Sequence, residues 1–147
     1  MTSDASPTEP TTNAHRTDIQ VRFNDTDALG HINNTSFALY AEVARVEMLS
    51  WMRSAPVFLI LAHIALDFRR QGRFDDEIYV LSYVEKLGRS SITLKQDIYA
   101  EDELAAEVRS VVVLFDYDAQ QAVPLSDKQR GYLEAHRLEP SLGQTNA

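Results

Sequence analysis

The feature that most constrains the fold is residues 34–55, a long segment without glycine or proline. Asn33 and Asn34 stand where the N-cap of a helix belongs. Apolar residues spaced i, i+3, i+4, i+7 form one stripe, namely Phe37, Tyr40, Ala41, Ala44, Met48, Trp51 and Met52, and others lie elsewhere on the wheel, namely Leu39, Val43, Val46 and Leu49. A helix that is apolar nearly all round is buried on more than one side. The rest of the chain must therefore wrap this helix.

Strand-like segments supply the wrapping. Four of them follow the helix, at residues 57–70, 77–87, 90–100 and 104–117, and a short candidate, residues 19–23, precedes it. Their short connections indicate hairpins and antiparallel pairing. In the first of the four, alternation places on one face Phe58, Ile60, Ala62, Ile64, Leu66 and Phe68. With a short final helix at 126–136, the order predicts an α+β fold, in which a curled antiparallel sheet of about five strands surrounds one long central helix.

The length of 147 residues fits one domain. The first residues are rich in Ser, Thr and Pro and lack the pattern of a signal peptide, and the last residues lose hydrophobic periodicity. We therefore expect a disordered leader at 1–16, the folded domain at 17–136 and a disordered tail at 137–147.

Charge and residue usage exclude several function classes. Fourteen Lys and Arg against 22 Asp and Glu give a net charge of −8, which repels nucleic acid. The chain has no cysteine, which excludes thiolate chemistry and fits a cytoplasmic location. Residues 55–66 form the longest nearly apolar run, well short of the roughly 20 residues that span a membrane. The four histidines show no metal-binding spacing, and no dinucleotide-binding motif is present, so we expect no metal and no redox cofactor.

The polar loop before the helix carries the densest group of chemically active side chains. The string D-x-D-x-x-G-H-x-N-N runs from Asp25 to Asn34, and E-x-A-R follows from Glu42 to Arg45. Together with L-G-R-S-S at residues 87–91, these motifs resemble those of the hotdog-fold acyl-CoA thioesterases of the 4-hydroxybenzoyl-CoA thioesterase type. The order of elements agrees with this family from about residue 17 to residue 133.

The resemblance implies a hotdog thioesterase domain and hydrolysis of an acyl-CoA to free acid and CoA. It implies a homo-oligomer, either a homodimer or a homotetramer, and coenzyme A enters only as part of the substrate. In the family the second aspartate of the D-x-D pair is catalytic, which corresponds to Asp27, while Asp25 falls on a position without that role.

The chemistry of thioester hydrolysis independently requires a carboxylate and hydrogen-bond donors. A carboxylate must attack the carbonyl or deprotonate a water, and donors must face the oxygen where negative charge develops. Asp27 lies shortly before the helix, whose first-turn N–H groups and dipole could receive that oxygen. His31 either positions water or the thioester sulfur, or is structural. Glu42 is a reserve carboxylate, although an ion pair with Arg45 is its simplest role.

The other candidate residues fall into three groups. Asn33 is first an N-cap and is also assigned to the catalytic residues. Residues of the helix are expected to contact the substrate, namely Asn34, Thr35, Phe37 and Tyr40. Residues near two turns are expected to bind the phosphates of coenzyme A, namely Arg70, Lys86, Arg89, Ser90 and Ser91. Of these, Arg89 is the strongest candidate because the flanking glycine and serines add further donors.

Two alternative functions remain open. A non-catalytic module that binds acyl-CoA or an acyl carrier would use the same groove without turnover. Another hotdog enzyme, such as an enoyl-CoA hydratase, would need a paired acid and base, for which His31 and Asp27 are available. The sequence does not identify the acyl group, because one methylene changes binding by only about 1 kcal/mol.

Overall fold

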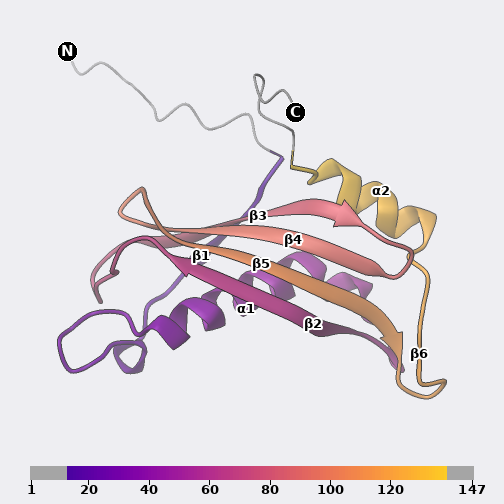
Figure 1. Cartoon of the computed structure of the whole chain (residues 1–147), viewed down its shortest axis with the longest axis horizontal. Helices are drawn as coiled ribbons and strands as arrows, with labels where there is room; N and C mark the ends of the chain where they lie inside the picture. Colours follow the sequence, from indigo (N-terminus) through magenta and orange to yellow (C-terminus); the bar gives the residue numbers. More distant parts are fainter. Residues whose placement is uncertain (1–12, 139–147) are drawn as a thin grey trace, which may run out of the picture.

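The computed structural model describes residues 13–138, and within them a curled antiparallel sheet packs on one long helix (Figure 1). The strand order is β1-β3-β4-β5-β2, with β6 added beside β5. The elements are β1 (His15–Ile19), η1 (Phe23–Asp25), α1 (Asn34–Leu49), η2 (Ser50–Met52), β2 (Val57–Phe68), β3 (Ile78–Leu87), β4 (Ser91–Ala100), β5 (Glu103–Asp116), β6 (Gln121–Ala122) and α2 (Asp127–Ala135). The predicted α+β architecture is thus confirmed, with β6 as a short addition to the five expected strands.

The first strand lies earlier than predicted. The sequence favoured residues 19–23, but β1 is His15–Ile19 and residues 23–25 form a 3-10 turn. The reason is tertiary, because β1 pairs along β3 from His15 opposite Ser82 to Ile19 opposite Ile78, where β3 begins. Residues beyond Ile19 therefore have no strand to pair with.

Pairing with β3 also extends the fold past both predicted boundaries. At the start, β1 includes His15 and Arg16, which were assigned to the leader. At the end, the N–H of Leu138 donates to the carbonyl of Val84 at 2.8 Å, within the predicted tail. Backbone hydrogen bonds order these residues without any apolar pattern in their side chains. The remainder of both predicted segments, residues 1–12 and 139–147, lies outside the described residues.

A bulge in β2 corrects the predicted division of its faces. The register with β5 shifts between Leu61 and His63, and a bulge reverses the alternation of side chains beyond it. Leu59 therefore packs against the core together with Ile64, Leu66 and Val57. The predicted single face from Phe58 to Phe68 is split between the two sides of the sheet.

The long helix is confirmed, although it ends earlier than the glycine- and proline-free segment. Its N-cap is Asn33, and after Leu49 the chain tightens into the 3-10 turn η2 and becomes extended at Arg53. The predicted stripe is buried from Phe37 to Met48, whereas Trp51 is 42% exposed. The shorter helix α2 has Ser126 as its N-cap, as expected.

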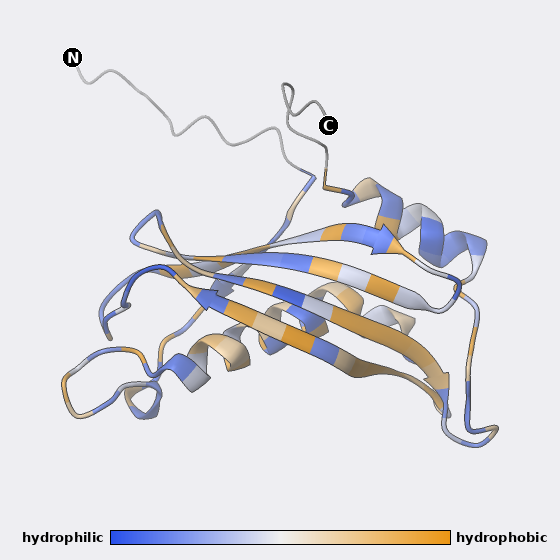
Figure 2. Ribbon diagram, viewed as in Figure 1, coloured by the Kyte–Doolittle hydropathy of each residue, from blue (hydrophilic) through white to orange (hydrophobic). Residues whose placement is uncertain are grey.

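The sheet covers only one side of α1. Figure 2 shows apolar and polar residues alternating along the strands, as expected where one face packs on a helix. On the flanks of α1, Leu39, Val43 and Val46 remain 37%, 45% and 47% exposed. The expectation that the helix is wrapped on more than one side is therefore not met by a single protomer.

Candidate active site

Asp27 lies at the centre of a closed loop that leads into α1. Its Oδ1 accepts hydrogen bonds from the N–H of Leu29 at 2.8 Å and of His31 at 3.0 Å, and its own N–H donates to the carbonyl of His31 at 2.7 Å. Gly30 allows this turn with φ of 79°. The side chain is exposed, and Oδ2 makes no hydrogen bond to any described residue. One oxygen thus fixes the loop while the other faces solvent.

The N-terminus of α1 offers fewer free donors than the sequence predicted. The side chain of Asn33 accepts from the N–H of Thr35 at 3.0 Å, and the carbonyl of Asn33 accepts from the N–H of Ser36 at 2.8 Å. Among the N–H groups expected to receive the carbonyl oxygen, only that of Asn34 has no partner in the part of the chain that the structure describes. The N-cap role of Asn33 is confirmed, and its side-chain oxygen is occupied by the hydrogen bond from Thr35.

His31 is fixed by its backbone. It forms an isolated bridge with Arg73, in the connection between β2 and β3, and the adjacent N–H of Ile32 donates to the carbonyl of Gly72 at 2.7 Å. The ring is half-buried and makes no hydrogen bond within residues 13–138. His31 therefore lies beside Asp27 with an imidazole available to a ligand.

Asp25 has a role that the sequence did not predict. It is 2% exposed, and its carboxylate accepts from the N–H and guanidinium of Arg22 and from the hydroxyl of Tyr40 at 2.9 Å. Its carbonyl accepts from Asn33 N–H at 2.8 Å and from Ser36 Oγ at 2.9 Å. Asp25 therefore ties both ends of the loop that carries Asp27 to the first turns of α1.

The ionised form of Asp25 is stabilised. Burial alone raises the pKa of this carboxyl, but hydrogen bonds from Arg22 and Tyr40 outweigh burial, so the pKa lies below its ordinary value. Because the pKa of Asp25 is lower in the folded protein than in the unfolded chain, its ionisation stabilises the folded protein at pH values above the pKa of the unfolded chain. This stabilisation is lost as the pH falls through the pKa of the folded protein.

Asp25→Asn is expected to lower the free energy of unfolding by about 2 kcal/mol at pH 7, because the guanidinium of Arg22 and the buried hydroxyl of Tyr40 lose a charged acceptor. The stability of the parent should also fall as the pH drops below about 4, and this decrease should be smaller in the variant. Urea unfolding at several pH values measures both effects. A variant as stable as the parent at pH 7 would show that the contacts of Asp25 do not hold the loop.

Two residues predicted to contact substrate belong to the core. Phe37 is 1% exposed, and its ring packs against those of Tyr40 and Phe68 with centroids 6.1 Å apart in each case. Tyr40 is 2% exposed, and its hydroxyl donates to Asp25. Burial, followed by the hydrogen bond to Asp25, raises the pKa of Tyr40 above its ordinary value. The inward direction of the stripe removes both side chains from the surface.

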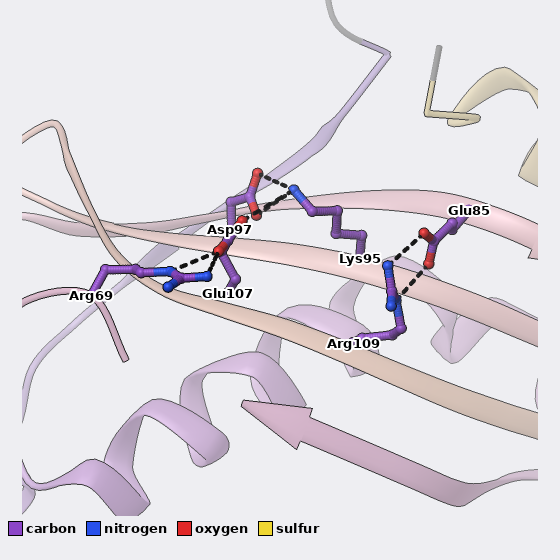
Figure 3. A network of polar contacts seen from close by, with 6 residues as sticks. All are labelled: Arg69, Glu85, Lys95, Asp97, Glu107 and Arg109. Carbon is purple, nitrogen blue, oxygen red and sulfur yellow. Dashed lines mark hydrogen bonds and ion pairs between the residues drawn. The ribbon is translucent and has the colours of Figure 1, made fainter. Parts of the chain in front are cut away.

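Arg70, which the sequence assigns to the phosphates, forms an ion pair within the protein. Its Nη1 lies 2.6 Å from Oε2 of Glu103. Its neighbour Arg69 pairs with Glu107 at 2.7 Å, within a network on the face of the sheet away from α1 (Figure 3). The network also contains Lys95, Asp97, Arg109 and Glu85. A cation paired with a carboxylate is a poorer receptor for a phosphate, because that pair must first be broken.

Arg89 and Lys86 differ from Arg70, because they are exposed and form no ion pair with the described residues. They flank the turn between β3 and β4, where Arg130 of α2 donates to the carbonyls of Gly88 at 2.7 Å and of Arg89 at 3.2 Å. Ser90 is buried and its carbonyl accepts from Leu114 N–H, whereas Ser91 is half-buried. Sequence reasoning missed Arg130, because its acceptors are backbone atoms of a distant turn that no local pattern reveals.

The two parts of the predicted site lie at opposite ends of the protomer. The loop with Asp27 lies beside the β2–β3 connection, and the turn with Arg89 lies at the far end of β3, next to α2 (Figure 1). The ten residues of β3 between them span about 30 Å. Within one protomer, the structure therefore does not bring Asp27 and Arg89 together.

Glu42, the reserve carboxylate, is exposed and lies on the flank of α1 near β2. The expected ion pair with Arg45 is absent, because Arg45 turns inward to Gln96. Glu42 follows Asn34 by eight positions, about 12 Å along the helix axis. It is therefore remote from the loop that carries Asp27.

Residues 13–138 contain no group of three or more His, Asp or Glu side chains that could hold a metal ion. In the same residues no helix is long and apolar enough to cross a membrane.

The sequence and the fold match those of known proteins. The model of the Thioesterase-like superfamily matches residues 21–133. The chain belongs to this superfamily. It is 28% identical over 127 residues to the long-chain acyl-CoA thioesterase FadM of Escherichia coli (strain K12), a match that covers 81% of this chain and 96% of FadM.

Solved structures of thioesterases are similar to this chain in sequence and fold. A predicted thioesterase from Bacillus stearothermophilus is 27% identical with a TM-score of 0.79, and the match covers 87% of this chain and 99% of that one. A thioesterase from Thermus thermophilus, complexed with coenzyme A and Zn, is 30% identical with a TM-score of 0.71, over 80% and 95% of the two chains. The hotdog fold and the assignment as a thioester hydrolase are thereby confirmed.

Proposed function

We propose that this chain hydrolyses acyl-CoA thioesters to free acid and CoA, with Asp27 as the nucleophile or the general base. The observation that carries this proposal is the geometry of Asp27: one oxygen holds the loop and the other is exposed beside the N-terminus of α1. The similarity to an acyl-CoA thioesterase and to a thioesterase bound to coenzyme A supports the choice of substrate class.

The groups around the Asp27 carboxylate are suited to the other steps of the hydrolysis. The N–H of Asn34, at the positive end of the α1 dipole, is suited to the carbonyl oxygen as negative charge develops there. His31 lies next to Asp27 in the same loop and is suited to position water or the leaving sulfur. Either role of Asp27 requires its ionised form.

A homodimer accounts for the separation of Asp27 and Arg89. Two protomers that lie side by side in opposite directions place the β3–β4 turn of one near the Asp27 loop of the other. A homodimer also covers the apolar residues of α1 that the sheet leaves exposed. A homotetramer would consist of two such pairs. Sedimentation at micromolar concentration is expected to give a species of at least twice the protomer mass of 16.6 kDa. A species of only the protomer mass would contradict a site formed by two protomers.

Arg89→Ala is expected to raise KM for acyl-CoA several-fold, because the guanidinium that binds phosphate is removed. The effect on a substrate truncated to the pantetheine arm should be smaller, because that substrate carries no nucleotide phosphates. Arg137→Ala, which removes a half-buried arginine that follows α2 and pairs with Glu134, is the control and should leave both KM values near those of the parent. Equal losses on the two substrates for Arg89→Ala would indicate damage to the fold instead of a lost phosphate contact.

The alternative functions are separated by one assay. Free-thiol release from a panel of acyl-CoAs detects hydrolysis, whereas a binding module releases none. An enoyl-CoA hydratase would consume enoyl-CoA and leave the thioester intact. We expect thiol release on at least one acyl-CoA, and release that is no faster than the uncatalysed reaction would contradict the proposal.

A further inference from the structure

The helix α2 lies beside the turn between β3 and β4 (Figure 1), and one of its arginines forms hydrogen bonds with that turn. Nη2 of Arg130 donates to the carbonyl of Gly88 at 2.7 Å and to the carbonyl of Arg89 at 3.2 Å. The N–H of Leu125, just before α2, donates to the same carbonyl of Arg89 at 2.9 Å. The half-buried guanidinium of Arg130 is therefore the charged donor that connects α2 to the backbone of this turn.

The backbone acceptors of the turn, residues 88–91, are all occupied by the protein itself. The carbonyl of Ser90 accepts from the N–H of Leu114 at 2.9 Å, and the carbonyl of Ser91 accepts from the N–H of Gly88 at 2.8 Å. The carbonyls of Gly88 and Arg89 are bonded to α2 and the residue before it. The turn therefore presents little negative charge to a ligand.

Two backbone donors of the same turn remain free. The N–H groups of Arg89 and Ser90 have no acceptor in the part of the chain that the structure describes. A trans peptide points its C=O and the following N–H in opposite directions. Because the carbonyls of Gly88 and Arg89 face α2, the N–H groups of Arg89 and Ser90 face away from it. Successive N–H groups in a turn form a concave site for an anion.

The side chains of the turn add positive charge to these donors. Arg89 and Lys86 are exposed and form no ion pair with residues 13–138. The hydroxyl of Ser91 lies so close to Gly88 that a side chain at position 88 would clash with it. In a chain with a net charge of −8, this turn is a local site of positive charge and is suited to a phosphate.

We propose that Arg130 is a positioning residue for the recognition of the coenzyme A phosphates. By holding the carbonyls of Gly88 and Arg89 against α2, it keeps the N–H groups of Arg89 and Ser90 free for a phosphate. It also fixes the backbone from which the Arg89 side chain extends. Arg130 lies on the carbonyl side of the turn and acts through the turn, without a phosphate contact of its own. This inference rests on the proposed function, which assigns the phosphates to the turn, and adds the residue that orients it.

Titration calorimetry with free CoA tests the inference without any turnover. Arg130→Ala is expected to raise the Kd for CoA several-fold, because the turn is no longer held with its N–H groups toward the ligand. In the hydrolysis assay KM for acyl-CoA should rise by the same factor with kcat unchanged, and KM for the substrate truncated to the pantetheine arm should stay near that of the parent. Arg130→Lys should restore much of the affinity, because an ammonium group can still donate to both carbonyls.

A double variant separates positioning from direct contact. Arg130→Ala combined with Arg89→Ala should raise the Kd for CoA by less than the product of the two single effects, because both substitutions act on the same turn. Two independent phosphate contacts would give the full product. Lys128→Ala is the matched control, because Lys128 is an exposed cation of α2 that forms no hydrogen bond or ion pair with the described residues. Its Kd for CoA should equal that of the parent.

The proposal is overturned if Arg130→Ala leaves the Kd for CoA unchanged, or if the double variant shows the full product. Equal rises in KM on both substrates, with a lower free energy of unfolding, would show that Arg130 only stabilises the fold. A parent without affinity for CoA would overturn both this inference and the proposed function. A parent that binds CoA with the expected dependence on Arg130 but releases no thiol would contradict the proposed hydrolysis and support the role of Arg130.

Discussion

Asp27→Asn is expected to lower kcat for acyl-CoA hydrolysis by at least about a hundredfold. The amide has almost the same size as the carboxyl, and its oxygen can still accept from the N–H groups of Leu29 and His31 that close the loop. What is lost is the negative charge, which both attack on the carbonyl and activation of water require. Steady-state kinetics together with an unfolding curve show whether activity falls while stability is retained.

The control for this substitution has to be chosen from the structure. Asp25→Asn is the obvious choice in the sequence, but Asp25 is buried and holds the loop. Asp75 is exposed in the connection between β2 and β3, and Asp75→Asn should retain most activity. If Asp27→Asn turns over thioesters within a few-fold of the parent while Glu42→Gln is inactive, the catalytic carboxylate lies on α1 and the assignment to Asp27 is wrong.

Phe37→Ala is expected to destabilise the protein by about 3–5 kcal/mol, because it removes a ring from the centre of the core. Phe37 is 1% exposed, and its Cζ lies 3.4 Å from where a side chain on Gly72 would begin. A cavity at this point therefore also loosens the connection that forms hydrogen bonds with Ile32. Urea unfolding measures the loss.

Phe23→Ala provides the comparison for a surface ring. Phe23 is 79% exposed and contacts only Phe74 by its ring among the described aromatic side chains, so the free energy of unfolding should change by less than about 0.5 kcal/mol. If Phe37→Ala leaves stability unchanged and raises KM instead, Phe37 contacts the substrate as the sequence first indicated, and its placement in the core is wrong.

Local patterns predicted the elements of this fold well. Asn33 before a glycine- and proline-free segment marks the start of α1, and the stripe from Phe37 to Met48 identifies its buried face. Alternation and turn residues locate each end of β3, β4 and β5 to within one residue. These signals depend only on neighbours in the chain, so they can be read without knowledge of the tertiary structure.

The features that the sequence did not predict arise from contacts between distant residues. The position of β1 depends on where β3 begins, and the faces of β2 depend on a bulge that no composition marks. Tyr40 donates to Asp25 across 15 positions, a contact that supports the loop and that no local pattern reveals. Arg70 is neutralised by Glu103, which is 33 positions away. Each of these facts requires the folded chain.

Release of free CoA thiol by the parent protein from acyl-CoAs of increasing chain length tests the proposed hydrolysis directly. We expect release on at least one of them, with an equimolar yield of free acid, and loss of that release in Asp27→Asn. Tight binding of acyl-CoA by the parent without any thiol release would contradict the proposed hydrolysis and indicate a binding module with the same fold.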